Sequence, residues 1–237
     1  MQAVRSISRN LSDAMQPLSF GGDVAYVYNP LEYARVPHEA FIDRYARPSA
    51  RILLIGMNPG PFGMAQTGVP FGDVVAVRDW MGIEEEVGRP PAEHPKRPVL
   101  GFGLTRREGS GKRLWGWAER RFGTADRFFD QIYVHNYCPL LFVHETGRNV
   151  VPEKLSKAER TSIFGPCDEA LHALVEAMQP EVVIGVGKFA WKRATEILGD
   201  GAETDCILHP SPASPLANKD WPGQVEPVFE RHGVAFE

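Results

Sequence analysis

The sequence predicts an α/β protein in which a parallel sheet carries helices on both faces. Four short apolar runs rich in β-branched residues indicate buried strands, and segments with the apolar spacing of helices lie between them. Strands that alternate with helices form parallel sheets that are covered on both sides. The strands are expected at residues 51–57, 131–135, 182–186 and 205–208.

The helices are expected from their apolar spacing and from the residues at their ends. Residues 112–122 and 157–178 have this spacing, and Ser156 is in position to cap the second helix. A third helix over 188–198 is expected to end at Gly199. Residues 58–110 are rich in glycine and proline, so we expect long loops there and one short helix at 74–81. Residues 1–237 are expected to form one domain around a single core.

Composition narrows the class of protein. Hydrophobic residues make up 43% and charged residues 24% of the chain, as in ordinary globular proteins, and no apolar run approaches the length of a membrane span. Residues 1–19 lack the apolar core of a secretory signal. We therefore expect an intracellular protein with no membrane partner, in the cytoplasm or nucleoid of a bacterium or the nucleus of a eukaryote.

Cysteine spacing and net charge exclude two further classes. Cys138, Cys167 and Cys206 lie far apart, so neither a zinc site nor an iron–sulfur site is expected. The net charge of -4 is unlike that of a protein that coats nucleic acid, although DNA binding needs only a local basic surface. Such a surface can draw on basic residues at 94–97, 106–107, 112–113, Arg148 and Lys219.

Polar side chains follow three of the predicted strands at the same end. Asn58 follows the first strand, Asn136 follows the second, and the fourth leads into His209. Because ligands of open α/β sheets bind beyond the carboxyl ends of the strands, these residues predict a pocket. Each stands beside a proline-containing turn, and each alone is also compatible with a purely structural role. The pattern itself leaves the chemistry of the pocket open.

A family resemblance assigns that chemistry. The segment GMNPGPFGMAQTGVPFG at residues 56–72 resembles the first motif of the single-strand-selective monofunctional uracil-DNA glycosylases. The similarity resumes at 77–83, 94–101, 134–142, 147–149, 208–212 and 215–219. It implies a central four-stranded parallel sheet flanked by helices, as in the uracil-DNA glycosylase superfamily. It also implies DNA as partner and neither a metal nor an organic cofactor.

The resemblance also implies roles for residues of the pocket. Asn58 matches the residue that positions the attacking water, and His209 matches the residue that stabilises negative charge on O2 of the departing base. Asn136 matches the reader of the pyrimidine edge, and Phe71 matches the aromatic on which the flipped base stacks. Met57 and Gly60 match the wall near the 5-position of the base, where Gly60 leaves room for a substituent such as hydroxymethyl.

The chain departs from the family in one place. After the matched Pro212 the family often has Arg and then Asn, whereas this chain has Ala213 and Ser214. The stretch belongs to the wedge that fills the hole left by the flipped nucleotide, and Lys219 lies on the same DNA-facing loop. The departure puts duplex invasion in doubt rather than the chemistry.

These observations predict a monomeric, monofunctional DNA glycosylase that releases uracil or a 5-substituted uracil and leaves an abasic site. Three alternatives stay open. One is a glycosylase of the same fold that prefers another deaminated base, such as a purine. The second is a protein that binds DNA lesions without turnover. The third is a hydrolase of free nucleosides, which would need neither the wedge nor the basic clusters.

Overall fold

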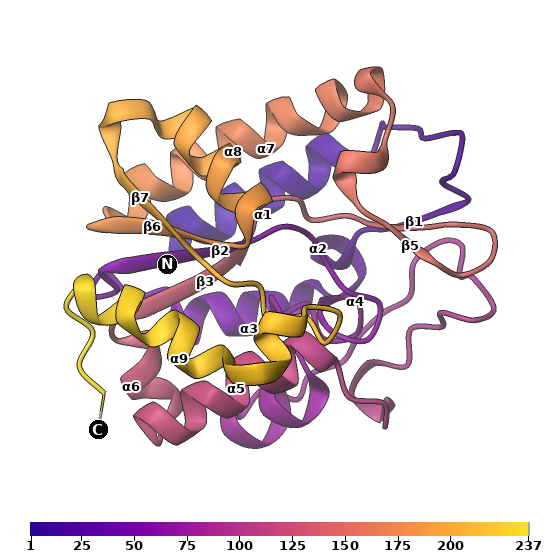
Figure 1. The fold of residues 1–237 in the computed structure, drawn as a ribbon. Coiled ribbons are helices and arrows are strands. Elements are labelled where there is room, and N and C mark those ends of the chain that lie inside the picture. Colours follow the sequence, from indigo (N-terminus) through magenta and orange to yellow (C-terminus); the bar gives the residue numbers. More distant parts are fainter. Residues whose placement is uncertain (237) are drawn as a thin grey trace.

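A central parallel sheet lies between two layers of helices in the computed structural model, which describes residues 1–236 (Figure 1). Its strand order is β3-β2-β6-β7, and every neighbouring pair is parallel. The fold class predicted from the sequence is therefore confirmed. The strands are β2 (Ile52–Gly56), β3 (Ile132–Asn136), β6 (Val182–Val186) and β7 (Glu203–Ile207).

Burial explains why these runs form strands. Residues 52–55 of β2 are at most 1% exposed, because β2 is an inner strand with helices over both faces. The register sets Gly56 opposite Asn136 at the carboxyl ends of β2 and β3. At the other edge, β7 keeps partly exposed side chains and begins two residues earlier than the sequence predicts.

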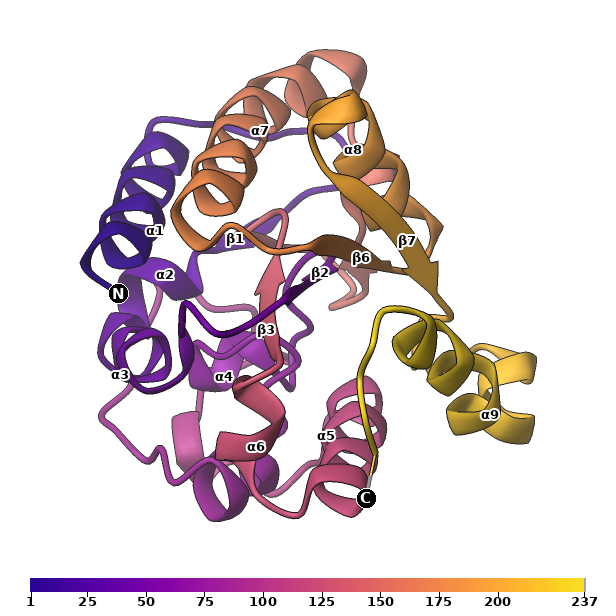
Figure 2. The same cartoon turned by 90° about the vertical axis from the view of Figure 1, so that its left-hand side faces the viewer.

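The two helical layers are seen most clearly when the sheet is viewed edge-on (Figure 2). On one face, α8 lies directly against the sheet, with α7 and α1 beside it. On the other face lie α3, α5, α6 and α9. Their bounds are α1 (Gln2–Met15), α3 (Arg35–Tyr45), α5 (Gly109–Phe122), α6 (Ala125–Phe129), α7 (Lys157–Met178), α8 (Lys188–Leu198) and α9 (Pro215–Arg231).

Aromatic side chains fill much of the core on the α5 side. Trp117 of α5 stacks on Phe229 of α9 with ring centroids 5.1 Å apart, and Phe41 of α3 stacks on Tyr133 of β3 at 5.6 Å. Each of these rings is almost completely buried. Large buried aromatic rings contribute much of the apolar burial of a core, so these contacts hold α3 against the sheet and α5 against α9.

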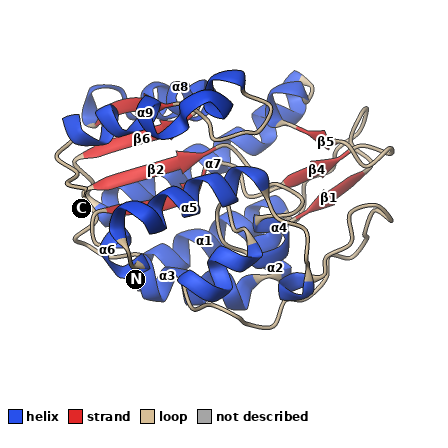
Figure 3. Cartoon of the chain, turned by 60° about the horizontal axis from the view of Figure 1, so that its bottom comes forward, coloured by secondary structure: helices blue, strands red, loops and turns tan. Residues whose placement is uncertain are grey.

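A second, antiparallel sheet stands apart from the central one (Figure 3). Its order is β1-β4-β5, with β1 (Tyr26–Tyr28), β4 (Leu141–Val143) and β5 (Asn149–Val150). The sequence does not predict it, because its strands are very short and β1 pairs with residues more than a hundred positions away. Its strands β4 and β5 follow β3 closely along the chain, so the sheet lies near the carboxyl edge of the central sheet.

Helix ends and short turns complete the chain. Ser156 caps α7 as expected: its hydroxyl accepts from the backbone N–H of Glu159, whose carboxylate accepts in return from the backbone N–H of Ser156. The short helix expected at 74–81 is a π-helical turn at Ala76–Trp80. Other short elements are α2 (Pro30–Tyr33), α4 (Met64–Thr67) and 3₁₀ turns at Gly101–Gly103, Pro152–Lys154 and Gly199–Gly201.

Candidate active site

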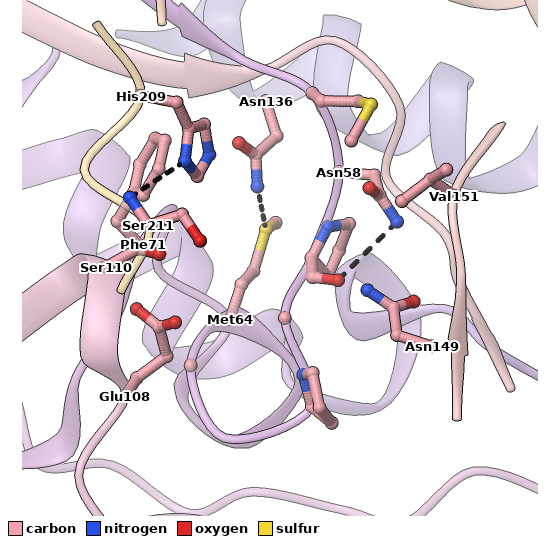
Figure 4. Close-up of a pocket in the computed structure, with 15 residues that line it drawn as sticks. Asn58, Met64, Phe71, Glu108, Ser110, Asn136, Asn149, Val151, His209 and Ser211 are labelled. Carbon is pink, nitrogen blue, oxygen red and sulfur yellow. Dashed lines mark hydrogen bonds between the residues drawn. The ribbon is translucent and has the colours of Figure 1, made fainter. Parts of the chain in front are cut away.

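The side chains expected to form a pocket surround one cavity of about 380 Å³ at the carboxyl edge of the central sheet (Figure 4). Asn136 ends β3, whereas Asn58 and His209 follow β2 and β7 after two residues. Phe71 comes from the loop after α4. The strands thus bring together residues that are up to 151 positions apart. The lining includes Met57, Asn58, Gly60, Phe71, Asn136 and His209.

Asn136 is buried and its amide is held in one orientation. Its Nδ2 donates to the sulfur of Met64 at 3.2 Å, and a thioether can accept a hydrogen bond but cannot donate one. Gly56 lies opposite in the register, and a Cβ there would overlap Oδ1 of Asn136. The glycine therefore lets the amide lie flat against β2. The two neighbours give the amide a defined donor end and a defined acceptor end.

His209 is a neutral donor. Its Nδ1 accepts a hydrogen bond from the backbone N–H of Ser211 at 3.1 Å, so Nδ1 carries no proton. Burial lowers the pKa of His209 from its ordinary value, so the ring is neutral at pH 7 and the proton is on Nε2. The chain passes close behind the ring at Gly187, where φ is +87° and a Cβ would lie 3.3 Å from Cβ of His209.

Phe71 has a backbone conformation that bulky residues seldom adopt. Its φ is +54°, in the left-handed region. The strained turn is held by its carbonyl oxygen, which accepts from Nε1 of Trp115 at 3.0 Å and from the backbone N–H of Asp73 at 2.7 Å. The ring lies beside that of His209, with centroids 6.1 Å apart. Strain of this kind is stored where a side chain must face a site, and here it turns the ring into the cavity wall.

In Figure 4, Asn58 and His209 lie on opposite sides of Asn136, and Asn58 faces the cavity. Its Nδ2 donates to the carbonyl oxygen of Leu140 at 3.1 Å. The amide is thereby oriented so that Oδ1 is the atom with which the side chain can accept from a water. Met57 lies beside Asn58 in the cavity wall, and the backbone N–H of Cys138 donates to its carbonyl oxygen at 2.9 Å.

The loop after His209 lies against the start of α5. Arg113 of α5 donates to the carbonyl oxygens of Pro210 and Ser211 at 3.1 and 3.3 Å and to Oδ1 of Asn218 at 2.7 Å. Ser214 caps α9 by accepting from the backbone N–H of Ala217. The exposed residues at this tip include Pro212, Ala213, Leu216 and Lys219.

The basic residues expected to bind DNA differ in the side chains that they contact. The guanidinium of Arg107 lies 2.6 Å from Oδ2 of Asp73, whose side chain is fully buried. We therefore assign this arginine a structural role rather than DNA contact. The guanidinium groups of Arg97 and Arg106 lie 5.1 and 3.8 Å from the ring centre of Phe62, next to cavity residues Pro61 and Gly63. Arg97 and Arg106 therefore add positive charge near the mouth of the cavity.

Comparison with known proteins identifies the family. Residues 43–227 match the model of the Uracil DNA glycosylase superfamily. Over 214 residues the chain is 46% identical to the single-strand selective monofunctional uracil DNA glycosylase of Bos taurus, covering 89% of this chain and 79% of the relative. The Mus musculus protein of that name is 44% identical over 227 residues, covering 94% and 81%. The chain belongs to the single-strand selective monofunctional family within the uracil-DNA glycosylase superfamily.

A solved structure supports the fold of this glycosylase-family chain. The crystal structure of wild-type SMUG2 from Pedobacter heparinus matches it with a TM-score of 0.64, covering 95% of this chain and 96% of that one. The two sequences are 18% identical, so the likeness extends to the fold alone. Within the described residues 1–236, no helix is long and apolar enough to cross a membrane, and no cluster of His, Cys, Asp or Glu is arranged to hold a metal ion.

Sequence reasoning missed several residues of the cavity wall. Met64 is one, because its contact with Asn136 joins residues that are 72 positions apart. Another is Glu108, which precedes α5 and turns its carboxylate into the cavity. Acidic residues are common at helix starts, so nothing in the sequence distinguishes this one. The remaining additions are Pro59, Pro61, Gly63, Ser110, Asn149, Val151 and Ser211.

Proposed function

We propose that the protein is a monofunctional DNA glycosylase that flips uracil, or a uracil altered at its 5-position, out of DNA and hydrolyses its N-glycosidic bond. The observation that carries this proposal is the neutral His209, whose Nδ1 is occupied by Ser211 while its ring lines the same cavity as Asn136 and Phe71. The relatives from Bos taurus and Mus musculus are uracil-DNA glycosylases by name, which supports the same substrate.

The cavity matches the hydrogen-bonding edge of uracil. Uracil offers N3–H as a donor and O4 as an acceptor, and the amide of Asn136 meets them with Oδ1 and Nδ2. Cytosine presents the reverse pattern, so the orientation held by Met64 disfavours it. Phe71 provides a face on which the flipped base stacks. His209 then donates from Nε2 to O2 of the base.

The proposed reaction begins with cleavage of the glycosidic bond. The electron pair of the bond between C1′ and N1 leaves with the base, and the hydrogen bond from His209 stabilises the negative charge that develops on O2. A water positioned by Oδ1 of Asn58 adds its oxygen to C1′, and its proton is taken up by the departing base or by solvent. An amide is a poor proton acceptor, so cleavage runs ahead of water attack, through a sugar with oxocarbenium character.

The products are free base and an abasic site, without a covalent enzyme intermediate. A lyase would need an amine placed to form a Schiff base. None of the cavity-lining residues in the described part of the chain is a lysine. Lys219, expected on the loop after Pro212, lies instead in α9, close to its start. We assign DNA contact to it and to Pro212, Ala213 and Ser214 of the loop that precedes α9. We assign a monomer as the working unit.

One panel of substrates tests the function and its alternatives. Oligonucleotides that carry uracil, 5-hydroxymethyluracil, hypoxanthine or xanthine, single- and double-stranded, are scored for abasic sites beside free deoxyuridine. Release of uracil from DNA but not from deoxyuridine supports the proposal. Release of purines alone would identify a different base, binding without release would identify a lesion-binding protein, and cleavage of deoxyuridine would identify a nucleoside hydrolase.

A further inference from the structure

Glu108 brings a carboxylate to the cavity that the proposed chemistry does not use. The residue is the N-cap of α5, and its Oε2 accepts a hydrogen bond from the backbone N–H of Gly111. The side chain nonetheless lies along the cavity wall (Figure 4). The carboxylate also accepts hydrogen bonds from the backbone and the hydroxyl of Ser110, and it still borders the cavity.

The backbone at this position is firmly anchored. The backbone N–H of Glu108 donates at 2.9 Å to Oδ1 of Asp73, a carboxylate that is completely buried and also pairs with Arg107. An anchored backbone with a capping contact leaves the side chain little freedom. Its carboxylate is thus a fixed feature of the wall rather than a mobile surface group.

Gly63 and Gly111 leave room for this side chain, and Gly60 lies within ordinary contact distance of it. A Cβ at Gly60 would lie 3.8 Å from Oε1, one at Gly63 would lie 2.8 Å from Cγ, and one at Gly111 would lie 2.9 Å from Oε2. A larger residue at Gly63 or Gly111 would push the carboxylate away. The glycines also surround it with backbone in place of water, and this burial raises the pKa of Glu108 above its ordinary value.

The position of Glu108 relative to a bound base follows from the other walls. Asn136 and His209 lie at one end of the cavity, and Glu108 lies toward the other end in Figure 4, beside Gly60. A pyrimidine that turns N3 and O4 to Asn136 and O2 to His209 has its C5–C6 edge on the opposite side of the ring. That edge faces the wall made by Gly60 and Glu108.

We propose that Glu108 determines which 5-substituted uracils the cavity accepts, by the charge and hydrogen-bonding capacity of the substituent. This inference rests on the proposed function. A neutral donor such as 5-hydroxymethyl gives its O–H to the carboxylate, and hydrogen bonds to charged acceptors are the stronger kind. An anionic 5-carboxyl meets a like charge where little water screens it, so it is rejected. Glu108 is the one carboxylate among the described residues that line the cavity.

The test compares Glu108→Gln with the unaltered protein on single-stranded oligonucleotides that carry uracil, 5-hydroxymethyluracil or 5-carboxyluracil. Glutamine keeps the length of the side chain and an oxygen that accepts from Gly111, but it removes the charge. The measured quantity is kcat/KM on each 5-substituted base divided by kcat/KM on uracil. Because each substrate is compared between two proteins, the effect of the substituent on the leaving group cancels.

The expected result is a change of the two ratios in opposite directions. The 5-hydroxymethyl ratio falls about tenfold, as loss of charge assistance in one hydrogen bond predicts, and the 5-carboxyl ratio rises by at least as much. Glu159→Gln is the matched control, because Glu159 is a helix-capping glutamate of α7 outside the cavity wall. It leaves both ratios unchanged.

Other outcomes overturn the inference. If Glu108→Gln lowers all three rates by one factor, Glu108 acts only by holding the start of α5, and a thermal melt will show the matching loss of stability. If both ratios stay at their original values, the carboxylate does not face the substituent. If the unaltered protein releases no uracil, the proposed function itself fails, which distinguishes the two failures.

Discussion

The backbone N–H of Ser211 donates to Nδ1 of His209 at 3.1 Å, and this contact fixes which nitrogen of the ring can act on a ligand. A nitrogen that accepts a hydrogen bond is deprotonated, so the proton of the neutral ring is on Nε2. Ser211 lies in the loop that Arg113 holds from α5. The same loop therefore sets the tautomer of His209 and presents Ala213 to solvent.

We expect the pKa of His209 to lie below that of an exposed histidine. Burial lowers its pKa from the ordinary value of 6.5, and protonating Nδ1 would break the contact with Ser211. Nitrogen-15 NMR of the imidazole rings checks this directly, with His209→Gln used to assign the signal. A protonated Nδ1 at pH 7, or a titration midpoint above 6.5, would contradict the assigned tautomer.

Asn58→Ala should retain DNA binding and lose most base release. The substitution removes the acceptor proposed to position water but leaves Asn136, Phe71 and His209 in place. Removal of such a contact lowers the rate of the chemical step by about 10² to 10⁴. Single-turnover release and binding to a uracil oligonucleotide are measured on the same preparation. Turnover near that of the unaltered protein would mean that Asn58 is only a turn residue.

Gly56→Ala should damage the cavity although glycine and alanine differ by one methyl group. The added Cβ would overlap Oδ1 of Asn136 and lie 2.7 Å from the ring of Phe71. Overpacking of this kind costs about 1 to 3 kcal/mol of stability, and here it also displaces both base-binding groups. We expect base release to fall at least tenfold and uracil binding to weaken.

Gly165→Ala on α7 is the control for Gly56→Ala, because a Cβ there meets no atom within 4 Å. It should keep full activity and gain slightly in stability, since alanine favours helix more than glycine does. Urea denaturation and single-turnover release are measured for both variants. If Gly56→Ala matches Gly165→Ala in both assays, the close approach of Asn136 to β2 contributes neither to stability nor to base release.

Two buried histidines should make stability depend on pH. Burial lowers the pKa of His38 to about 4 and that of His135 to about 3, so both are neutral in the folded protein. In the unfolded chain they take up protons below about pH 6.5. The unfolded state then binds more protons, so the free energy of unfolding falls as pH drops from 6.5 toward 4, by up to about 1.4 kcal/mol per pH unit for each histidine.

Urea titrations at several values between pH 7 and pH 4.5 measure this dependence. His135→Leu removes one of the two groups and should make the dependence shallower. His172→Gln is the comparison, because the His172 side chain is 58% exposed and its removal should leave the slope unchanged. Equal slopes for the unaltered protein and His135→Leu would show that other groups dominate acid unfolding.

The parts of the fold that could be predicted are those with a strong local signal. Residues 52–55 form a continuous apolar run because β2 is covered on both faces, and such runs stand out in any sequence. The sequence also predicts that Asn58, Asn136 and His209 lie together, because parallel strands end at the same edge of a sheet. Helices α1, α3 and α9 and the antiparallel sheet are not predicted by the sequence, because their formation depends on contacts distant in the chain, such as Phe41 with Tyr133.

The details of the cavity depend on contacts that sequence patterns do not carry. The positive φ of Phe71 is stabilised from α5, where the indole of Trp115 donates to its carbonyl oxygen. The path of Glu108 depends on Gly63, more than forty positions earlier in the chain. The family motif at residues 56–72 includes Phe71, whereas Glu108 lies outside all the segments that resemble the family.

The exposed loop after His209 departs from the family at Ala213. Ala213 stands where the family often has Arg, and its backbone N–H donates to the hydroxyl of Ser211 at 3.1 Å. A methyl group neither contacts phosphate nor fills a vacated base stack. Opening a duplex costs about a few kcal/mol, and least where the base is mismatched or already single-stranded. Without the guanidinium, less of this cost is offset.

Ala213→Arg should therefore raise release from U·A pairs more than from U·G pairs, and least from single strands. It should also steepen the plot of log binding constant against log salt concentration, by about the amount expected for one added phosphate contact. Because Ala213 is exposed and outside the cavity lining, the chemical step itself should not change. Single-turnover release from the three substrates at two salt concentrations measures both effects, and Ala213→Gln separates charge from size. Equal gains on all three substrates, or none, would mean that exposed neighbours such as Leu216 and Lys219 already act as the wedge, since Leu216 is 60% exposed at the start of α9.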